Sequence, residues 1–464
     1  MATESRPSIG SRLLDRATRP VDGASLAAFR IAFGVLLLVA IARHLAYGWV
    51  AAYYVAPRVF FPYPGLEWII PLPAAGMYAL YAGLALCALA IALGARTRLA
   101  AALFCLGFTY VHLIDRTNYL NHYYLVSLIS ALLVAVPAGA TWSLDARRRG
   151  AAAVPAWALW LLRGQLAVVY AFGALAKCNA DWLLHAEPLR IWLGANVDLP
   201  VLGPWMEEPW VAFAFSYAGL LFDATIVPLL LWRRTSRSAY LAVLAFHLLT
   251  AILFPIGMFP WLMIALTPIF FAADWPRQLL RRRPDSARPI AVRSGWRFAP
   301  LVAAAWIAVQ IALPLRHAIY DDDLYWHESG FRWAWQIMVM EKYGRAGFTV
   351  TDPATGQSWA VRPSEELTAL QNRMMATQPD MILSYAHHLA DRYAGDVGHP
   401  VQVRADVLVT LNGRPNARLV DPTVDLAALP DGAAARAWLL PHPDQQRSDA
   451  LAVAAQSSPL RKEE

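Results

Sequence analysis

The sequence predicts an α-helical polytopic membrane protein with a C-terminal extracytoplasmic α+β domain. Of its 464 residues, 58% are hydrophobic, and the mean hydropathy of +0.38 is too high for a water-soluble globular chain. Long apolar runs fill the first two thirds of the chain, and alternating strand patterns with turn sequences come only after the last run. We therefore expect about nine transmembrane helices followed by a soluble region.

The apolar runs are the candidate transmembrane helices, and several are short enough to need a tilted or paired helix. The first run follows a polar, arginine-bearing segment without a cleavable signal, so we expect it to act as an uncleaved anchor. The runs cover residues 26–48, 74–94, 99–114, 120–137, 154–176, 210–232, 238–256, 259–273 and 298–315.

Lysine and arginine are divided very unequally between alternate loops. One set of loops holds 19 of these residues, whereas the other set holds 3, namely Arg58, Arg116 and Arg190. Positive loops stay in the cytoplasm, which puts the N-terminus there and the chain beyond Leu315 outside. The net charge of +7 is then explained by anionic lipid at the inner surface, and no nucleic-acid partner is expected.

The composition changes after Leu315, where strand patterns begin. FTVT and SWAV flank the turn-rich DPATGQ over residues 348–361, which predicts a β-hairpin. VQVRADVLVTL alternates with period two before Asn412-Gly413, a strong turn signal. Between these strands we expect two helices, Ser364–Thr377 and Asp380–Tyr393, with the first residue of each as its N-cap.

These features divide the chain into four parts. The tail lacks periodicity beyond Ala433–Leu440 and is expected to be mobile. The parts are a cytoplasmic N-terminal segment (1–25), a transmembrane helical domain (26–315), an extracytoplasmic α+β domain (316–440) and the tail (441–464).

Three polar residues recur every seven positions in the fifth apolar run. Arg163, Tyr170 and Lys177 therefore lie on one helix face. A charge in hydrocarbon costs roughly 3 kcal/mol on insertion scales, so intramembrane charges usually face a protein-lined cavity. The alternative is that both cations snorkel to opposite interfaces. A lysine in a dry pocket can lose its proton near neutral pH and act as a general base.

Four further residues belong to the same candidate site. Asn121 and His122 open the fourth run at the membrane level of Lys177, while Asp223 and His247 lie within later runs. Asp223 has the alternative role of neutralising Arg163. No HExxH motif, cysteine pair or His-x-His spacing occurs, so no metal site is expected. A neutral amine beside a histidine and an asparagine suits proton removal from a lipid-soluble quinol.

Eight segments resemble, in both sequence and order, those of a known protein family. They are RPVDGASLAAFRIAFG (19–34), LIDRTNYLNHYYL (113–125), LRGQLAVVY (162–170), AKCNADW (176–182), FHLLTAILFPIGMFPW (246–261), DWPRQL (274–279), WAWQIMV (333–339) and ARLVDPTVDL (417–426). Together they resemble the vitamin K-dependent γ-glutamyl carboxylases over nearly the whole chain. The bacterial members with this architecture are the horizontally transferred transmembrane domain proteins. The resemblance implies a location in the bacterial inner membrane.

The resemblance also implies the chemistry. Such an enzyme deprotonates vitamin K hydroquinone, here a reduced menaquinone or related naphthoquinol, and couples its epoxidation by O2 to γ-carboxylation of glutamate by CO2. The family's base falls on Lys177, with Ala176 and Asn179 in place of a lysine and an aspartate of its motif. The family's Asn-His pair falls on Asn121 and His122, which would hold the hydroquinone oxygen.

The expected partners are membrane lipid, the quinol and a glutamate-containing peptide or protein. Met340 replaces a family histidine, and the animal enzymes continue into a longer lumenal region that helps hold a propeptide. Two alternatives are therefore a hydroquinone epoxidase without peptide carboxylation and a non-catalytic quinone-binding membrane protein. The further residues expected to contact the quinol are Arg163, Tyr170, His247 and Met338, with Asp223 supporting them.

Overall fold

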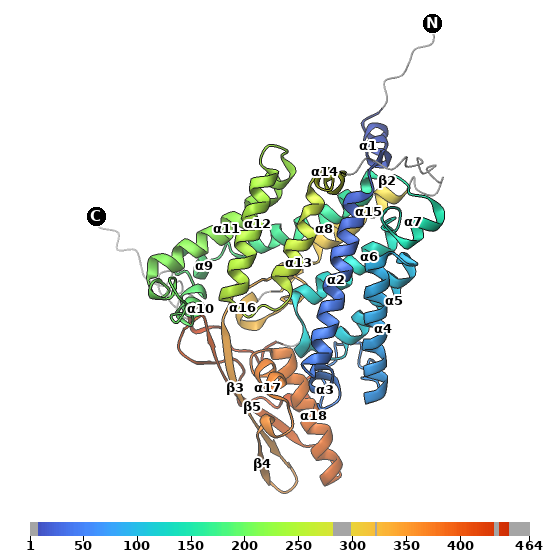
Figure 1. The fold of residues 1–464 in the computed structure, drawn as a ribbon. Helices are drawn as coiled ribbons and strands as arrows, with labels where there is room; N and C mark the ends of the chain where they lie inside the picture. Colours follow the sequence, from blue (N-terminus) through green and yellow to red (C-terminus); the bar gives the residue numbers. More distant parts are fainter. Residues whose placement is uncertain (1–7, 282–297, 321–322, 431–435, 445–464) are drawn as a thin grey trace, which may run out of the picture.

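The computed structural model describes residues 8–281, 298–320, 323–430 and 436–444. A helical part is followed by a C-terminal region built around a sheet (Figure 1). The start of the expected N-terminal segment, most of the last cationic loop and most of the expected tail lie outside the described residues.

Each predicted apolar run coincides with a helix. Within the described residues the structure confirms a mostly helical part with five helices long and apolar enough to cross a membrane, while a total of nine crossings stays a prediction. The five are α2 (Ala24–Ala46), α4 (Ala74–Leu93), α8 (Ala156–Ala176), α11 (Pro209–Leu231) and α12 (Ser236–Leu253). The shorter apolar helices are α5 (Thr97–Leu113), α6 (Asn121–Ala135), α13 (Phe259–Leu266) with η3 (Thr267–Phe270), and α15 (Ala299–Ala312).

Short elements connect these helices, and a small antiparallel pair joins β1 (Pro20–Val21) to β2 (Val154–Pro155). The short helices are α1 (Ile9–Thr18), α3 (Trp49–Tyr54), α7 (Leu144–Arg149), α9 (Ala180–Leu184), α10 (Leu189–Gly194), α14 (Trp275–Leu279) and α16 (Leu324–His327). The 3-10 turns between them are η1 (Arg116–Asn118), η2 (Gly203–Trp205) and η5 (Pro314–Ile319).

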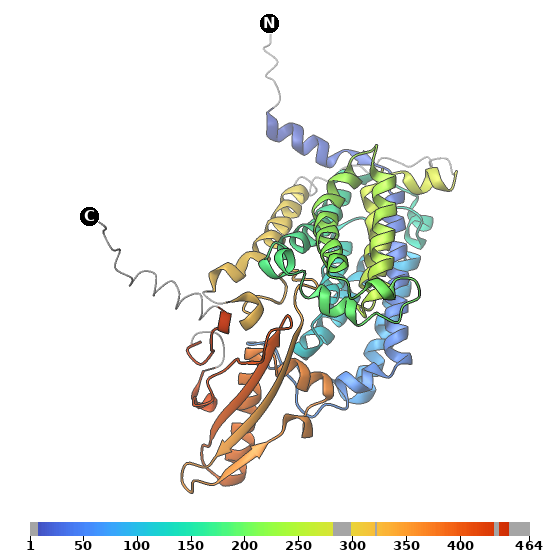
Figure 2. The same ribbon diagram turned by 90° about the vertical axis from the view of Figure 1, so that its left-hand side faces the viewer.

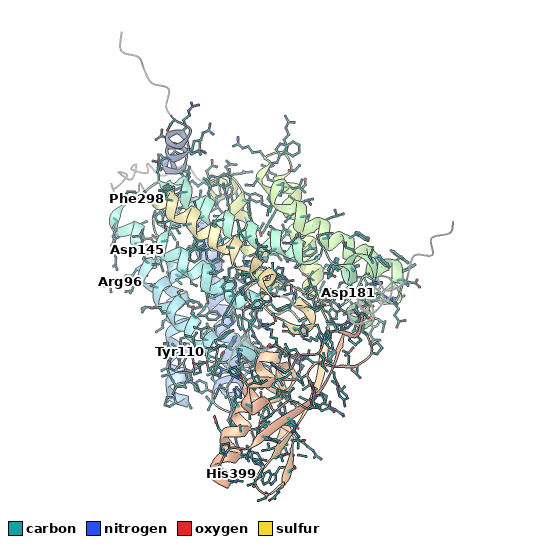
Figure 3. The ribbon with its side chains drawn as sticks, turned by 180° about the vertical axis from the view of Figure 1, so that it is seen from behind. Arg96, Tyr110, Asp145, Asp181, Phe298 and His399 are labelled. Atoms are coloured by element: carbon teal, nitrogen blue, oxygen red, sulfur yellow. The ribbon has the colours of Figure 1, made fainter. Side chains whose placement is uncertain are left out.

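The cationic loops gather at one end of the helical part. In Figure 1, α1, α7, α14 and the loop between α11 and α12 lie at the top, and the C-terminal sheet lies at the bottom. Figure 3 shows Arg96 and Asp145 toward the end where Phe298 lies, with His399 at the opposite end. This arrangement agrees with the loop charges, which predict opposite sides of the membrane for the two ends.

A buried arginine joins the helices at the cationic end. Arg30 of α2 is fully buried and donates hydrogen bonds to the carbonyl oxygens of Ile91 at 2.6 Å, Ala92 at 2.7 Å, Ala138 at 3.0 Å and Trp142 at 2.6 Å. A buried charge is tolerated when its donors are satisfied. Arg30 is therefore a structural residue that ties three segments together.

The C-terminal sheet has the strand order β4-β3-β5-β6, with antiparallel neighbours. Residues alternate between buried and more exposed along β5, and the buried face is covered by α18 (Pro379–Val397). Figure 2 shows the long β3–β5 pair running from the helical part to the far end of the molecule. The hairpin and the period-two strand are confirmed. The strands are β3 (Lys342–Thr351), β4 (Ser358–Val361), β5 (Gln402–Leu411) and β6 (Ala417–Arg418).

The first helix between the strands begins later than predicted. Ser364 lies in a 3-10 turn, η6 (Pro363–Glu365), and α17 covers Ala369–Met375. Thr368 is the N-cap, because its hydroxyl accepts from the Gln371 N–H at 3.3 Å and the Gln371 side chain accepts from the Thr368 N–H at 3.1 Å. This reciprocal capping box satisfies two otherwise free N–H groups, so the prediction of Ser364 as N-cap is wrong.

The prediction of Asp380 as an N-cap is also wrong. Helix α18 begins at Pro379, and the Asp380 carboxylate instead accepts hydrogen bonds from Arg116 at 2.8 Å and from Arg332 at 2.6 Å. The same Arg116 donates to Ser384 Oγ at 2.7 Å. These contacts join α18 to η1, so Asp380 links the C-terminal region to the helical part.

The C-terminal core also draws on the helical part. Val59 and Phe61, from the loop between α3 and α4, belong to the same buried apolar cluster as Phe348 and Tyr385. The Gln371 side chain donates to Val59 O at 2.7 Å and to Asp115 Oδ2 at 2.8 Å. The sheet-containing region is thus held against the helical part by both apolar and polar contacts.

Candidate functional site

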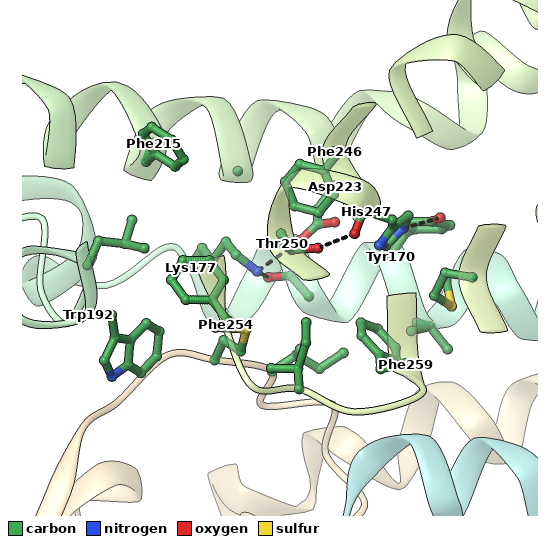
Figure 4. Close-up of a pocket in the computed structure, with 18 of the residues that line it drawn as sticks. Tyr170, Lys177, Trp192, Phe215, Asp223, Phe246, His247, Thr250, Phe254 and Phe259 are labelled. Atoms are coloured by element: carbon green, nitrogen blue, oxygen red, sulfur yellow. Dashed lines mark hydrogen bonds and ion pairs between the residues drawn. The ribbon is translucent and has the colours of Figure 1, made fainter. Parts of the chain in front are cut away.

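Lys177 follows the last residue of α8, and its side chain is only 7% exposed. The Nζ atom lies 2.8 Å from Asp223 Oδ2 and 3.1 Å from Gly173 O. It also lies 5.3 Å from the centroid of the Trp182 ring. The lysine therefore forms a buried ion pair between α8 and α11 (Figure 4).

The glycine one turn before Lys177 allows this pair to form. A Cβ atom at Gly173 would lie 3.2 Å from Asp223 Oδ2, which is tighter than ordinary contact. That oxygen is the one bonded to Lys177. Any larger residue at 173 would therefore press on the carboxylate and disturb the ion pair.

A second polar pair lies beside the first. The Tyr170 hydroxyl is 3.2 Å from His247 Nε2 and 3.3 Å from Thr267 Oγ1. His247 is 2% exposed, and its Nδ1 atom has no hydrogen-bond partner among the described residues. Buried polar atoms are rarely left without partners, which makes this nitrogen a candidate for binding a ligand.

These residues line a cavity of about 80 Å³. Its ionisable lining residues are Tyr170, Lys177, Asp223 and His247, as Figure 4 shows. Aromatic and aliphatic side chains make up most of the remaining wall. The cavity therefore combines a largely apolar wall with two hydrogen-bonded pairs of ionisable side chains.

Asn121 and His122 line a second, larger cavity of about 560 Å³. The Asn121 side chain accepts from the Tyr119 hydroxyl at 2.9 Å and donates to Gln336 O at 3.1 Å. The His122 ring packs on Tyr123 and Phe259 and has no hydrogen bond to another described residue. Its nitrogens are therefore available to a ligand in this cavity.

The two cavities adjoin. Ile256, Phe259, Ile337 and Met338 line both of them. The expected convergence of Asn121, His122 and Lys177 is therefore indirect, because Lys177 lines one cavity, Asn121 and His122 line the other, and the two cavities meet at these four shared residues. Met338 has a φ of 52°, in the left-handed region that costs a side-chain-bearing residue roughly 1–2 kcal/mol.

Two family models match successive parts of the chain. The HTTM domain matches residues 18–275, and the lumenal domain of vitamin K-dependent gamma-carboxylase matches residues 297–445. The chain belongs to the vitamin K-dependent carboxylase family. No solved structure matches it. Membership in this carboxylase family implies a membrane protein with an extracytoplasmic C-terminal domain, and it implies vitamin K hydroquinone, O2 and CO2 as co-substrates.

Arg163 lies away from both cavities in this carboxylase-family chain. It donates to Ile269 O at 2.8 Å and to Phe271 O at 2.7 Å, and it packs on the Trp160 ring. Fourteen residues of helix rise about 21 Å, so Arg163 lies on the same face of α8 as Lys177 but near the other end of the helix. The suggested pairing of Arg163 with Asp223 is wrong, since Asp223 bonds Lys177.

Sequence reasoning missed His44 of α2, which lines the larger cavity. Its Nδ1 atom lies 3.0 Å from Ala40 O, and its Nε2 atom lies 3.2 Å from the Tyr123 hydroxyl. The signal was present, because His44 is a titratable residue within an apolar run, as His247 is.

The larger cavity fits a naphthohydroquinone. Its volume of about 560 Å³ falls within the roughly 300–1,000 Å³ typical of small-molecule sites. Apolar residues from α2 and aromatic residues such as Phe104 and Phe108 suit a lipophilic ring, and His122 and Asn121 offer polar contacts for a hydroxyl.

Proposed function

We propose that the chain is a membrane vitamin K-dependent carboxylase-like enzyme. It would deprotonate a naphthohydroquinone, a reduced menaquinone or a relative, and couple its epoxidation by O2 to γ-carboxylation of glutamate by CO2. The observation that carries this proposal is the buried Lys177–Asp223 pair, which lies beside a cavity lined by Asn121 and His122. Family membership gives the reaction class, and this pair supplies a base for it.

Lys177 is the proposed base, and Asp223 is the proposed acceptor of its proton. The Lys177 amine lies 2.8 Å from a carboxylate oxygen of Asp223 and 3.1 Å from the carbonyl oxygen of Gly173, so the proposed base has a proton acceptor directly beside it. Passing one proton to Asp223 frees the amine to accept another. Such a transfer leaves a neutral pair in an apolar interior, which avoids the desolvation of two charges.

Asn121 and His122 would hold a hydroxyl of the bound hydroquinone and stabilise negative charge on its oxygen by hydrogen bonding. Met338 lines both cavities and would contact the ring. Tyr170 and His247 extend the hydrogen-bonding surface near Lys177. When bound, the hydroquinone supplies, through its oxidation by O2, the base that removes the γ-proton of glutamate.

The test is epoxide formation by the purified protein supplied with naphthohydroquinone and O2. Lys177→Ala should form no epoxide, whereas Cys178→Ala, at the exposed neighbouring position, should retain turnover. Thermal unfolding checks that both variants are folded. Equal turnover by Lys177→Ala and the unaltered protein would refute the proposal.

A second assay separates the alternatives. Labelled CO2 appearing in a glutamate-containing peptide supports full carboxylation. Epoxide without label supports a hydroquinone epoxidase, and quinone binding without either product supports a non-catalytic quinone-binding protein.

We further propose that the N-terminus is cytoplasmic, that residues 26–315 form the transmembrane domain and that residues 316–440 lie outside a bacterial inner membrane. Loop charge supports this orientation, since 19 lysines and arginines lie on one side and 3 on the other. The gathering of α1, α7 and α14 at the end opposite the sheet supports it too.

A further inference from the structure

A groove on the surface of the helical part shares no lining residue with the two cavities of the candidate site. It has a volume of about 410 Å³ and is formed by α4, α5 and α7, at the end where the cationic loops gather. We propose that this groove binds one anionic phospholipid from the membrane leaflet at that end. The binding is separate from the proposed reaction, which takes place in the two cavities.

One part of the groove is apolar and suits a lipid chain. Leu86 of α4 is 68% exposed, and Leu99 and Leu103 of α5 are each 51% exposed. Exposed apolar side chains that lie together on two packed helices mark a surface for membrane lipid. From Thr97 to Leu103 the helix rises roughly 9 Å, which reaches from the headgroup region into the hydrocarbon.

The other part of the groove carries two arginines. Arg96 lies in the turn between α4 and α5, and Arg148 lies on α7. Both residues are exposed, and neither side chain has a hydrogen bond or an ion pair with another described residue. Guanidinium groups bind phosphate through parallel charge-assisted hydrogen bonds. The groove therefore offers two cations to a phosphate and an apolar wall to the chain attached to it.

Asp145 also lines the groove, but its carboxylate is already engaged (Figure 3). Its oxygens accept from the Arg96 N–H at 2.9 Å, the Thr97 N–H at 2.9 Å and the Thr97 hydroxyl at 3.0 Å. The Asp145 N–H donates in turn to Gly94 O at 3.0 Å. Asp145 thus ties α7 to the turn before α5, so one hydrogen-bonded unit carries both arginines and leaves their side chains free for a ligand.

Charge and shape together favour an anionic phospholipid such as phosphatidylglycerol. A zwitterionic headgroup carries an ammonium that two arginines would repel, whereas an anionic headgroup keeps its full charge. Free phosphate would satisfy the arginines but would leave the apolar wall without contacts. Basic pockets between helices at a membrane surface bind anionic headgroups for these reasons.

The affinity is measured by native mass spectrometry of the purified full-length protein in detergent. Phosphatidylglycerol and phosphatidylcholine with the same acyl chains are the two probes, and the first should bind more tightly. Arg96→Gln and Arg148→Gln should each weaken phosphatidylglycerol binding roughly five-fold, the usual contribution of one cation near anionic lipid. Arg98→Gln and Arg147→Gln are matched controls, because both residues are exposed in the same segments and neither lines the groove. They should retain the affinity of the unaltered protein.

Cys87 of α4 reports the location, because it lines the groove. In a background with Cys105→Ser and Cys178→Ser, phosphatidylglycerol should slow the alkylation of Cys87 by N-ethylmaleimide, and inorganic phosphate should not. The control keeps Cys105 as the sole cysteine. Cys105 is half-buried like Cys87 but lies outside the groove, so phosphatidylglycerol should leave its alkylation rate unchanged.

Equal affinity of the unaltered protein for the two lipids would overturn the proposal. So would equal losses in the Arg96 and Arg98 variants, because binding would then follow overall charge. Equal protection of Cys87 by inorganic phosphate would assign the arginines to a free anion, and unchanged alkylation with phosphatidylglycerol bound would place the lipid elsewhere. Thermal unfolding checks that each variant is folded, and the two arms on the unaltered arginines decide the matter if one is not. Epoxide formation enters none of these measurements, so the lipid site and the proposed function can fail separately.

Discussion

Lys177 Nζ and Asp223 Oδ2 lie 2.8 Å apart, in side chains that are 7% and 11% exposed. The two residues come from different helices, so the pair depends on how α8 packs against α11. Each charge offsets the cost of burying the other, which makes the two residues interdependent in stability.

Removal of Asp223 alone should destabilise the protein, because it breaks the buried ion pair with Lys177. Asp223→Ala leaves a buried ammonium without its counter-charge, which costs roughly 3–5 kcal/mol. The double variant Lys177→Ala/Asp223→Ala leaves no buried charge, so its loss should be smaller than the sum of the single losses. Thermal unfolding of the three variants gives the comparison, and strictly additive losses would contradict a coupled pair.

Asp223→Asn should separate proton transfer from positioning. The asparagine side-chain oxygen can still accept a hydrogen bond from Lys177, but the amide cannot take up a proton. We expect epoxide formation to fall by roughly 10²–10⁴-fold, the usual contribution of a positioned acid or base. Turnover is compared with that of Cys178→Ala. Full activity in a folded Asp223→Asn protein would show that Lys177 releases its proton by another route.

The contact between Asp380 and its two arginines predicts an acid-sensitive interface. Burial raises the pKa of Asp380, but Arg332 and Arg116 lower it by more, so the folded-state pKa lies well below the usual value. A carboxyl group with a depressed pKa stabilises the fold above its unfolded pKa of roughly 4. This contribution is lost as the pH falls from that value through the folded-state pKa.

Asp380→Asn should therefore lower the unfolding temperature at neutral pH and flatten its decline in acid. Asp406→Asn is a suitable control, because the Asp406–Arg418 pair is exposed on both sides and should contribute little. If Asp380→Asn and the unaltered protein declined in parallel below pH 4, roughly the unfolded carboxyl pKa, the interface would not depend on this carboxylate.

Local patterns predicted most of the fold. The apolar runs and the period-two strand depend on neighbouring residues, and they reappear as helices and as β5. The partner of Lys177 could not be predicted from local patterns. Arg163 and Lys177 share a helix face with equal charge, so sequence spacing cannot decide which one meets Asp223, and the packing of α11 on α8 decides it.

The placement of Lys177 and His122 in two adjoining cavities could not be predicted for a similar reason. The sequence predicts a common membrane level for Lys177 and His122, but Ile337 and Met338, from a segment far along the chain, line both of the cavities that hold these two residues. Only tertiary structure places that segment there. His44, in contrast, carried a usable signal as a titratable residue in an apolar run.

The close contact between α2 and α4 predicts that a larger residue at Gly34 destabilises the protein. A Cβ atom there would lie 2.5 Å from Ala92 N and 2.8 Å from Ala92 Cα, so the helices would have to separate. Overpacking of this kind costs roughly 1–3 kcal/mol. Gly34→Ala should therefore lower the unfolding temperature, while Gly83→Ala, in open space on α4, should leave it unchanged or raise it. Equal unfolding temperatures would show that α2 and α4 can separate freely.

The proposed orientation predicts which positions a membrane-impermeant maleimide reaches in intact cells. Gln357 lies at the exposed tip of the β3–β4 hairpin, and Arg148 lies exposed on α7 at the opposite end of the molecule. In a background with Cys87, Cys105 and Cys178 replaced by serine, Gln357→Cys should be labelled from outside, since 316–440 is proposed to be extracytoplasmic. Arg148→Cys should be labelled only after permeabilisation, because the 19 cationic loop residues hold its side in the cytoplasm. The reverse pattern would invert the topology and would place the proposed quinol site at the cytoplasmic end of the helices.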